Sequence, residues 1–154
     1  MRQAIKQAVD AYAAGELPIG SVLLADGHLL ASSQTQVRRR ESMVAHGELT
    51  ALLDIKWDLY KHGRPIVLYT TLEPCLMCLG AIMQCGVDEV VYGMRCAPDG
   101  ATRFADTLAA ANQKPPKITS GILEDECVKV FRRWDLGKDH PAYNYVKAIL
   151  EPYK

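Results

Sequence analysis

The sequence has no excess of charge of either sign. Eighteen Lys and Arg residues balance eighteen Asp and Glu residues, and the pI is near 6.9. A chain without net charge has no overall field that would concentrate nucleic acid or an anionic membrane at its surface. We therefore expect that a polyanionic partner would need a local basic patch.

Long apolar runs are also missing. The N-terminal segment is charged throughout and lacks a signal-like apolar stretch, and no later run approaches the roughly 20 apolar residues of a membrane span. These absences predict a cytoplasmic chain without a membrane partner. A length of 154 residues with 49% hydrophobic composition predicts one domain over residues 1–154.

The cysteines are odd in number and no secretory signal accompanies them, which argues against a disulfide framework. Metal binding or packing in the core is the better interpretation. The five cysteines are Cys75, Cys78, Cys85, Cys96 and Cys127.

Hydrophobic periodicity and turn residues predict alternating helices and strands. A first helix over 2–14 carries Ile5, Ala8, Val9 and Tyr12 at helical spacing, and two short strands meet at the Asp26-Gly27 turn. The expected later elements are a helix from near Ala45, a strand at 66–71, a helix at 75–85, a strand at 89–93, a helix at 103–111, a strand at 117–122 and a helix at 124–136. The tail 140–154 is interpreted as a candidate appended helix.

The order of these elements predicts the fold class. Helices between the later strands imply parallel pairing through right-handed crossovers, whereas the first two strands form an antiparallel hairpin. We therefore expect an α/β fold, a three-layer α/β/α sandwich built on a mixed five-stranded sheet.

Two short motifs carry the chemistry: His46-Gly47-Glu48, and Pro74-Cys75-Leu76-Met77-Cys78. Each is weak alone, because H-x-E is frequent on helix surfaces and C-x-x-C also occurs in redox pairs, structural zinc sites and cores. The other three cysteines stand alone, without the second pair that a structural zinc site needs. Three ligands leave one open position, which is the arrangement of a catalytic zinc site.

The combined motif predicts a division of labour. His46, Cys75 and Cys78 would hold one Zn²⁺, and the open position would take a water whose pKa falls toward roughly 7. The free N–H groups at a helix start favour the thiolate form of the cysteines. Glu48 would move protons between the water and the leaving amine, as in zinc nucleobase deaminases with the H-x-E…P-C-x-x-C signature. The chain is thus predicted to be a zinc-dependent hydrolytic deaminase.

Beyond this signature, the segments 18–20, 68–82 and 90–93 resemble the cytidine and deoxycytidylate deaminase superfamily, and the likeness extends over residues 1 to about 135. The chain looks like the branch that contains fungal-type cytosine deaminase, bacterial guanine deaminase and the tRNA-specific adenosine deaminases. The resemblance implies the α/β/α fold, one zinc per subunit and a homodimer.

The branches differ in what they imply about the substrate pocket. The His46-Gly47-Glu48 triplet is similar to cytosine deaminase, whereas 93–101 is similar to the tRNA adenosine deaminases. The family places an Asn eleven residues before the zinc His, and this chain has Thr35 there. The candidate substrate contacts are Thr35, Gln36, Gly47, Leu72, Glu73 and Ile19. Core packing for Ile19 and Leu72, and a helix-start carboxylate for Glu73, remain open.

Three functions are compatible with the sequence. The favoured one is deamination of a free nucleobase or a related small amino-substituted heterocycle, with release of ammonia. The alternative is a tRNA or single-strand adenosine deaminase, in which arginines such as Arg38, Arg39, Arg40, Arg95, Arg103, Arg132 and Arg133 contact phosphates. The third is a non-catalytic zinc module, which has no use for a carboxylate such as Glu48 beside the ligands.

Overall fold

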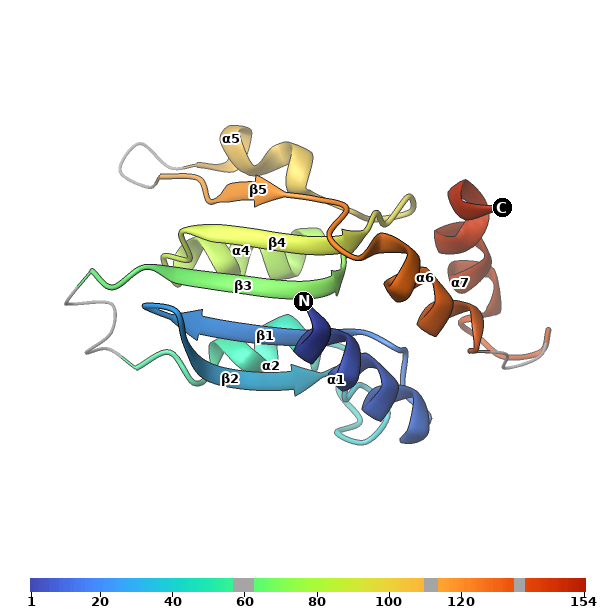
Figure 1. Ribbon diagram of the computed structural model, residues 1–154. Coiled ribbons are helices and arrows are strands. Elements are labelled where there is room, and N and C mark those ends of the chain that lie inside the picture. The colour runs from blue at the N-terminus through green and yellow to red at the C-terminus, as the bar shows by residue number, and fades with distance from the viewer. Residues whose placement is uncertain (57–62, 110–113, 135–137) are drawn as a thin grey trace.

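The computed structural model describes residues 1–56, 63–109, 114–134 and 138–154. These residues form a five-stranded sheet with the strand order β2-β1-β3-β4-β5 (Figure 1). The strands are β1 (Gly20–Ala25), β2 (His28–Gln34), β3 (Ile66–Leu72), β4 (Glu89–Met94) and β5 (Lys117–Thr119). The helices are α1 (Arg2–Ala13), α2 (Gly47–Leu52), α4 (Leu76–Gln84), η1 (Thr102–Phe104), α5 (Ala105–Leu108), α6 (Glu124–Arg132), α7 (Tyr143–Leu150) and η2 (Glu151–Tyr153).

Strand pairing follows the predicted pattern. β1 and β2 form an antiparallel hairpin whose turn residues Asp26 and Gly27 both have positive φ, 52° and 76°, as a turn matching the strand twist requires. β1 also pairs antiparallel with β3, while β3, β4 and β5 are parallel. The prediction of a mixed five-stranded sheet is therefore confirmed.

Helices cover both faces of this sheet. α1 and α6 pack on one face, and α2 and α4 lie behind the other (Figure 1). The core beneath α2 and α4 includes Leu23, Leu68 and Ile82, and the core beneath α6 includes Met94 and Phe131. The three-layer α/β/α arrangement is confirmed, and it sets α2 and α4 side by side on the same face of the sheet.

The buried face of α1 differs from the predicted one. Its small residues Ala4, Ala8 and Ala11 are buried, whereas Val9 and Tyr12 are exposed. A Cβ on Gly20 of β1 would lie 2.1 Å from the Ala4 carbonyl oxygen, so helix and strand approach too closely for larger side chains. Packing distance, rather than hydrophobicity, selects the inward face.

Several elements are shorter than the sequence predicts. The expected helix at 103–111 is the 3-10 turn η1 followed by the four-residue α5, and its last two positions lie outside the described residues. β5 ends at Thr119 rather than 122, and positive φ values at Gly121 and Leu123 turn the chain into α6. α6 ends at Arg132, and 135–136 of the expected helix also lie outside the described residues.

The C-terminal segment folds back on the body of the protein. α7 lies beside α6 (Figure 1), and its Val146 and Ile149 are buried in the cluster that contains Phe131 and Trp134. Across the described part of the chain, no helix combines the length and hydropathy needed to cross a membrane.

Candidate active site

Two helix starts bring the motif residues together. His46 is the N-cap of α2, and Cys75, which follows the end of β3, is the N-cap of α4. Both residues have extended backbone angles, and α2 and α4 contact each other. The unpaired N–H groups at these two helix ends favour negatively charged ligand atoms between them.

The three ligand atoms have the spacing of a tetrahedral metal site. His46 Nδ1 lies 3.5 Å from Cys78 Sγ and 3.7 Å from Cys75 Sγ, and all three atoms lie within 4.8 Å of one another. Zinc bonds of about 2.3 Å to sulfur and about 2.1 Å to nitrogen place tetrahedral ligands roughly 3.5–3.8 Å apart. The donor set therefore fits zinc with one coordination position free of protein.

Electrostatics within the cluster favour a thiolate. The hydrogen bond from Cys78, assisted by His46, lowers the pKa of Cys75 to about 4 against the cost of burial. The same hydrogen bond and burial raise the pKa of Cys78, so that in the metal-free site a proton on Cys78 is shared with a charged Cys75. His46 has a raised pKa, chiefly because of its hydrogen bond with Cys75. A metal cation bound by these three side chains would replace the protons on Cys78 and His46.

Glu48 stands beside the ligands in the first turn of α2. Its side chain is only 4% exposed, and desolvation by burial raises its pKa to about 6. The neighbouring charges that act on it are those of His46 and Cys75, and it is hydrogen-bonded to Cys78. A carboxyl group with a pKa near the working pH can both accept and return a proton.

Glu73 holds a loop. Its carboxylate accepts hydrogen bonds from the backbone N–H of Cys96 at 3.2 Å, the backbone N–H of Thr102 at 3.2 Å and the Thr102 hydroxyl at 2.5 Å. The donors belong to the β4–η1 loop (residues 95–101) and to the first residue of η1. The backbone N–H groups bound by Glu73 are therefore that of Cys96 in the loop and that of Thr102 at the start of η1.

The other candidate contacts fall into two groups. Thr35 is 2% exposed and its hydroxyl has no hydrogen-bond partner among the described residues, while Gly47 packs against the backbone of Gln34. Ile19 and Leu72 lie in the apolar core that includes Met94 and Phe131. The side chain of Gln36 accepts a hydrogen bond from Arg40.

The sequence did not reveal the role of Glu16, a buried carboxylate that binds the segment between β2 and His46. Glu16 is 3% exposed and accepts the backbone N–H groups of Arg38 and Arg39, at 3.0 and 2.7 Å. The Arg38 guanidinium in turn donates to the carbonyl of Gly15 at 2.7 Å. The segment that leads from β2 to His46 is thus tied to the end of α1, and no sequence motif signals contacts across 22 or 23 residues.

The comparisons with known proteins agree with this site. The profile of the cytidine and deoxycytidylate deaminase zinc-binding region matches residues 1–94, and the chain belongs to this family. The resemblance seen in the sequence is confirmed, and the cluster of His46, Cys75 and Cys78 fits the zinc site of this zinc-binding family.

Individual relatives and one solved structure show the extent of the similarity. The chain is 32% identical over 134 residues to the tRNA-specific adenosine deaminase of Bacillus subtilis, covering 82% of this chain and 81% of that protein. It is 38% identical over 133 residues to a tRNA(Ile)-lysidine synthase of Thermus thermophilus; this covers 86% of the chain but spans only 24% of that relative. A solved structure from a study of tRNA:A34 deaminases superposes with a TM-score of 0.75 at 30% identity, covering 84% of this chain and 96% of the other.

Proposed function

We propose that the protein is a zinc-dependent hydrolase that deaminates an adenosine in tRNA. The observation that carries this proposal is the similarity to the B. subtilis tRNA-specific adenosine deaminase, which extends over about four-fifths of both chains. One reason why the sequence alone favours a free heterocycle is that the net charge is zero. That argument is weak, since a substrate meets the local surface around the site and not the average charge of the chain.

The chemistry requires water to replace an amino group on a ring carbon, with ammonia as the second product. Zinc held by His46, Cys75 and Cys78 supplies a Lewis acid that makes water nucleophilic at neutral pH. In this proposal Glu48 carries two protons in succession. It accepts one from the attacking water and gives it to the ring nitrogen, and it then accepts the second from the new hydroxyl on the ring carbon and gives it to the amine, which leaves as ammonia. Its burial beside the ligands and its pKa of about 6 suit this double role.

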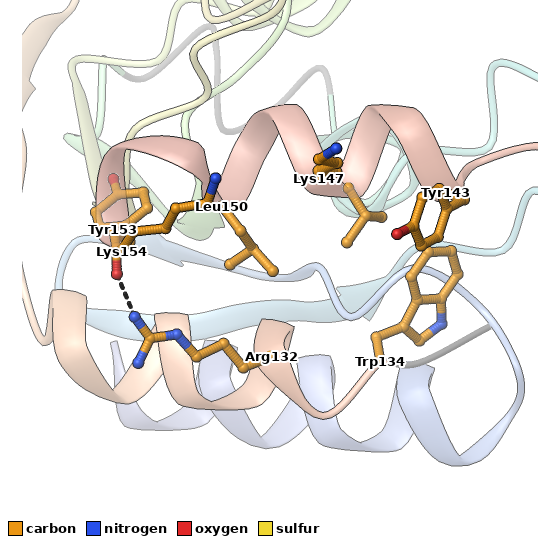
Figure 2. A pocket seen from close by; sticks show the side chains of 8 residues that line it. Arg132, Trp134, Tyr143, Lys147, Leu150, Tyr153 and Lys154 are labelled. Carbon is orange, nitrogen blue, oxygen red and sulfur yellow. Dashed lines mark hydrogen bonds between the residues drawn. The ribbon is translucent and has the colours of Figure 1, made fainter. Parts of the chain in front are cut away.

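A basic and aromatic cavity supports a nucleic-acid substrate. It has a volume of about 430 Å³ and lies between α6 and α7 (Figure 2). Its cationic lining residues are Arg132, Lys147 and Lys154, and its aromatic ones are Trp134, Tyr143 and Tyr153. Cations that neutralise phosphates and rings on which unpaired bases stack are the two devices by which proteins hold single-stranded nucleic acid.

The residues around the zinc site suggest how the base is held. We propose that Thr35 and Gly47 contact the substrate, because Thr35 offers a buried hydroxyl without a partner among the described residues and Gly47 opens α2. We propose that the other four candidates act through their packing and hydrogen bonds within the protein and not through direct contact with the substrate: Gln36, Ile19, Leu72 and Glu73.

The proposal is tested with a substrate screen. Purified zinc-loaded protein is incubated with an anticodon stem-loop containing adenosine, the same stem-loop containing cytidine, and free cytosine, guanine, adenine, aminotriazines and pterins. We expect inosine in the nuclease digest of the adenosine stem-loop, and a steep loss of activity between about 50 and 200 mM salt. Faster ammonia release from a free base than from every RNA would show that the small-molecule function is the right one.

A homodimer remains a proposal. Large apolar side chains are exposed near the site: Met43 at 78%, Val44 and Leu76 at 57%, and Met77 at 38%. Burial of these side chains against a second copy of the chain would remove apolar surface from water, which favours association. Light scattering coupled to size exclusion should give twice the chain mass of 17.0 kDa, and a mass of one chain at micromolar concentration would contradict the proposal.

A further inference from the structure

The β4–η1 loop (residues 95–101) lies directly against the segment that carries the first cysteine ligand. Gly100 forms an isolated antiparallel bridge with Cys75, and the Ala101 N–H donates to the Pro74 carbonyl at 2.9 Å. The Glu73 carboxylate also accepts a hydrogen bond from the N–H of Cys96 in the same loop. A displacement of this loop would therefore move the backbone at Cys75.

The other side of the loop is held by α7. The Tyr145 hydroxyl donates to both carboxylate oxygens of Asp99, at 3.1 and 3.2 Å, and the Cys96 thiol donates to the same carboxylate at 2.7 Å. Tyr145 is half-buried whereas Asp99 is exposed. The Tyr145 hydroxyl and the Cys96 thiol thus hold the exposed carboxylate of Asp99 in place.

A second tyrosine attaches the start of the same loop. The Tyr153 hydroxyl accepts a hydrogen bond from the N–H of Arg95 and also contacts the Glu124 carboxylate at 3.2 Å. The C-terminal segment is therefore hydrogen-bonded to the loop at two residues, Arg95 and Asp99. Both contacts lie beyond residues 1–94, to which the family profile extends.

We propose that Tyr145 is a positioning residue of the deaminase site, which fixes the Asp99 carboxylate and thereby holds the β4–η1 loop against the zinc ligand Cys75. The part of this inference that concerns turnover rests on the proposed function. Because the loop contacts Cys75 through the Gly100 bridge whereas Glu48 lies on α2, loosening the loop should weaken substrate binding more than it slows the chemical step.

The test compares Tyr145→Phe with Tyr12→Phe, a matched loss of a hydroxyl on the exposed side of α1. Both proteins should bind one zinc per chain, and Tyr12→Phe should melt like the wild type. In Tyr145→Phe alone, we expect amide hydrogen exchange across 96–101 and zinc transfer to a chromophoric chelator to become about tenfold faster or more, the worth of one hydrogen bond to a charged acceptor. KM for the adenosine stem-loop should rise by a similar factor, with kcat within about twofold.

Variants of Asp99 separate the hydrogen bond from the charge and serve if Tyr145→Phe folds poorly. Asp99→Leu should reproduce the faster exchange and zinc transfer, whereas Asp99→Asn, which keeps an acceptor for the hydroxyl, should stay near the wild type in both. Asp99→Leu also removes the acceptor of the Cys96 thiol, so the double variant Tyr145→Phe/Asp99→Leu should be no worse than Asp99→Leu alone.

The outcomes are distinct. Additive effects of the two substitutions, or a Tyr145→Phe protein that matches Tyr12→Phe in loop exchange, zinc transfer and KM, would overturn the positioning role. If instead no RNA is deaminated by the wild type but exchange and zinc transfer change as expected, the proposed function fails and the positioning of the loop stands.

Discussion

Replacing Glu73 by Gln tests whether this buried carboxylate holds the β4–η1 loop or meets the substrate. Glu73 is 7% exposed, and its two oxygens accept three hydrogen bonds from Cys96 and Thr102. Gln has nearly the same shape but only one acceptor oxygen. If that oxygen keeps the two bonds from Thr102, the amide nitrogen faces the N–H of Cys96 and that donor loses its partner.

The expected cost follows from these contacts. A hydrogen bond to a charged acceptor contributes about 1.5–3 kcal/mol, and a buried donor left unpaired costs about 1–3 kcal/mol. We therefore expect the Glu73→Gln substitution to lower the free energy of unfolding by about 2 kcal/mol. For a chain of this size that corresponds to a fall in melting temperature of about 4–8 °C.

The assay is urea and thermal unfolding of zinc-loaded wild type, Glu73→Gln and Glu41→Gln, the last being a matched change at an exposed position. Glu41→Gln should stay within about 0.5 kcal/mol of the wild type. The reasoning is refuted if Glu73→Gln unfolds like the wild type yet has a raised KM, because that result identifies Glu73 as a substrate contact and not as the anchor of the loop.

Three further outcomes are expected at the zinc site and in the core. Glu48→Gln should keep one zinc per chain, measured by elemental analysis, and lose about 10²- to 10⁴-fold in kcat, because the proton carrier is gone while the ligands remain. Cys75→Ala should lose stoichiometric zinc under the same measurement, since two protein ligands hold the ion poorly. In zinc-loaded protein at pH 8, Cys96 and Cys127 should resist alkylation followed by mass spectrometry, because burial raises the pKa of both thiols to about 12 and the thiolate gains weight only as the pH approaches that value.

Each of these expectations has a contrary result. An active Glu48→Gln protein would remove that residue from the mechanism, and full zinc in Cys75→Ala would show that the ligand set is different. Rapid labelling of Cys127 in the folded, zinc-loaded state would contradict its burial at 2% exposure. Chelation of zinc should add Cys75 as the fastest-labelled thiol, because its pKa lies near 4 in the metal-free site.

The zinc site could be predicted from the sequence because its signals are local. The H-x-E and P-C-x-x-C spacings place each residue on a helix start, and the structure brings His46, Cys75 and Cys78 to within ligand distance. The anchors of the site could not be predicted in this way. Glu73 binds residues 23 and 29 positions away, and Tyr145 meets Asp99 across 46 positions, so neither pair leaves a periodic or adjacent pattern in the sequence.

The fold shows the same division between local and distant information. The Asp26-Gly27 hairpin and the parallel order of β3, β4 and β5 follow from turn chemistry and from the helices between the strands. The buried face of α1 does not, because hydrophobicity favours Val9 and Tyr12 whereas the close approach at Gly20 admits only alanines. Periodicity identifies a helix, but the distance to its neighbour decides which side turns inward.

The net charge of the sequence says little about the substrate, because the fold decides where the charged side chains lie. The arginines that form a visible run are partly used within the chain: Arg38 binds the Gly15 carbonyl and Arg40 binds Gln36. The cations of the cavity in Figure 2 come from helices separated in sequence. They include Arg132 on α6, which is itself bonded to the Tyr153 carbonyl, and Lys147 on α7. A zero sum over 154 residues is therefore compatible with a local field that attracts phosphates. Zero net charge is thus no objection to the RNA substrate that we propose.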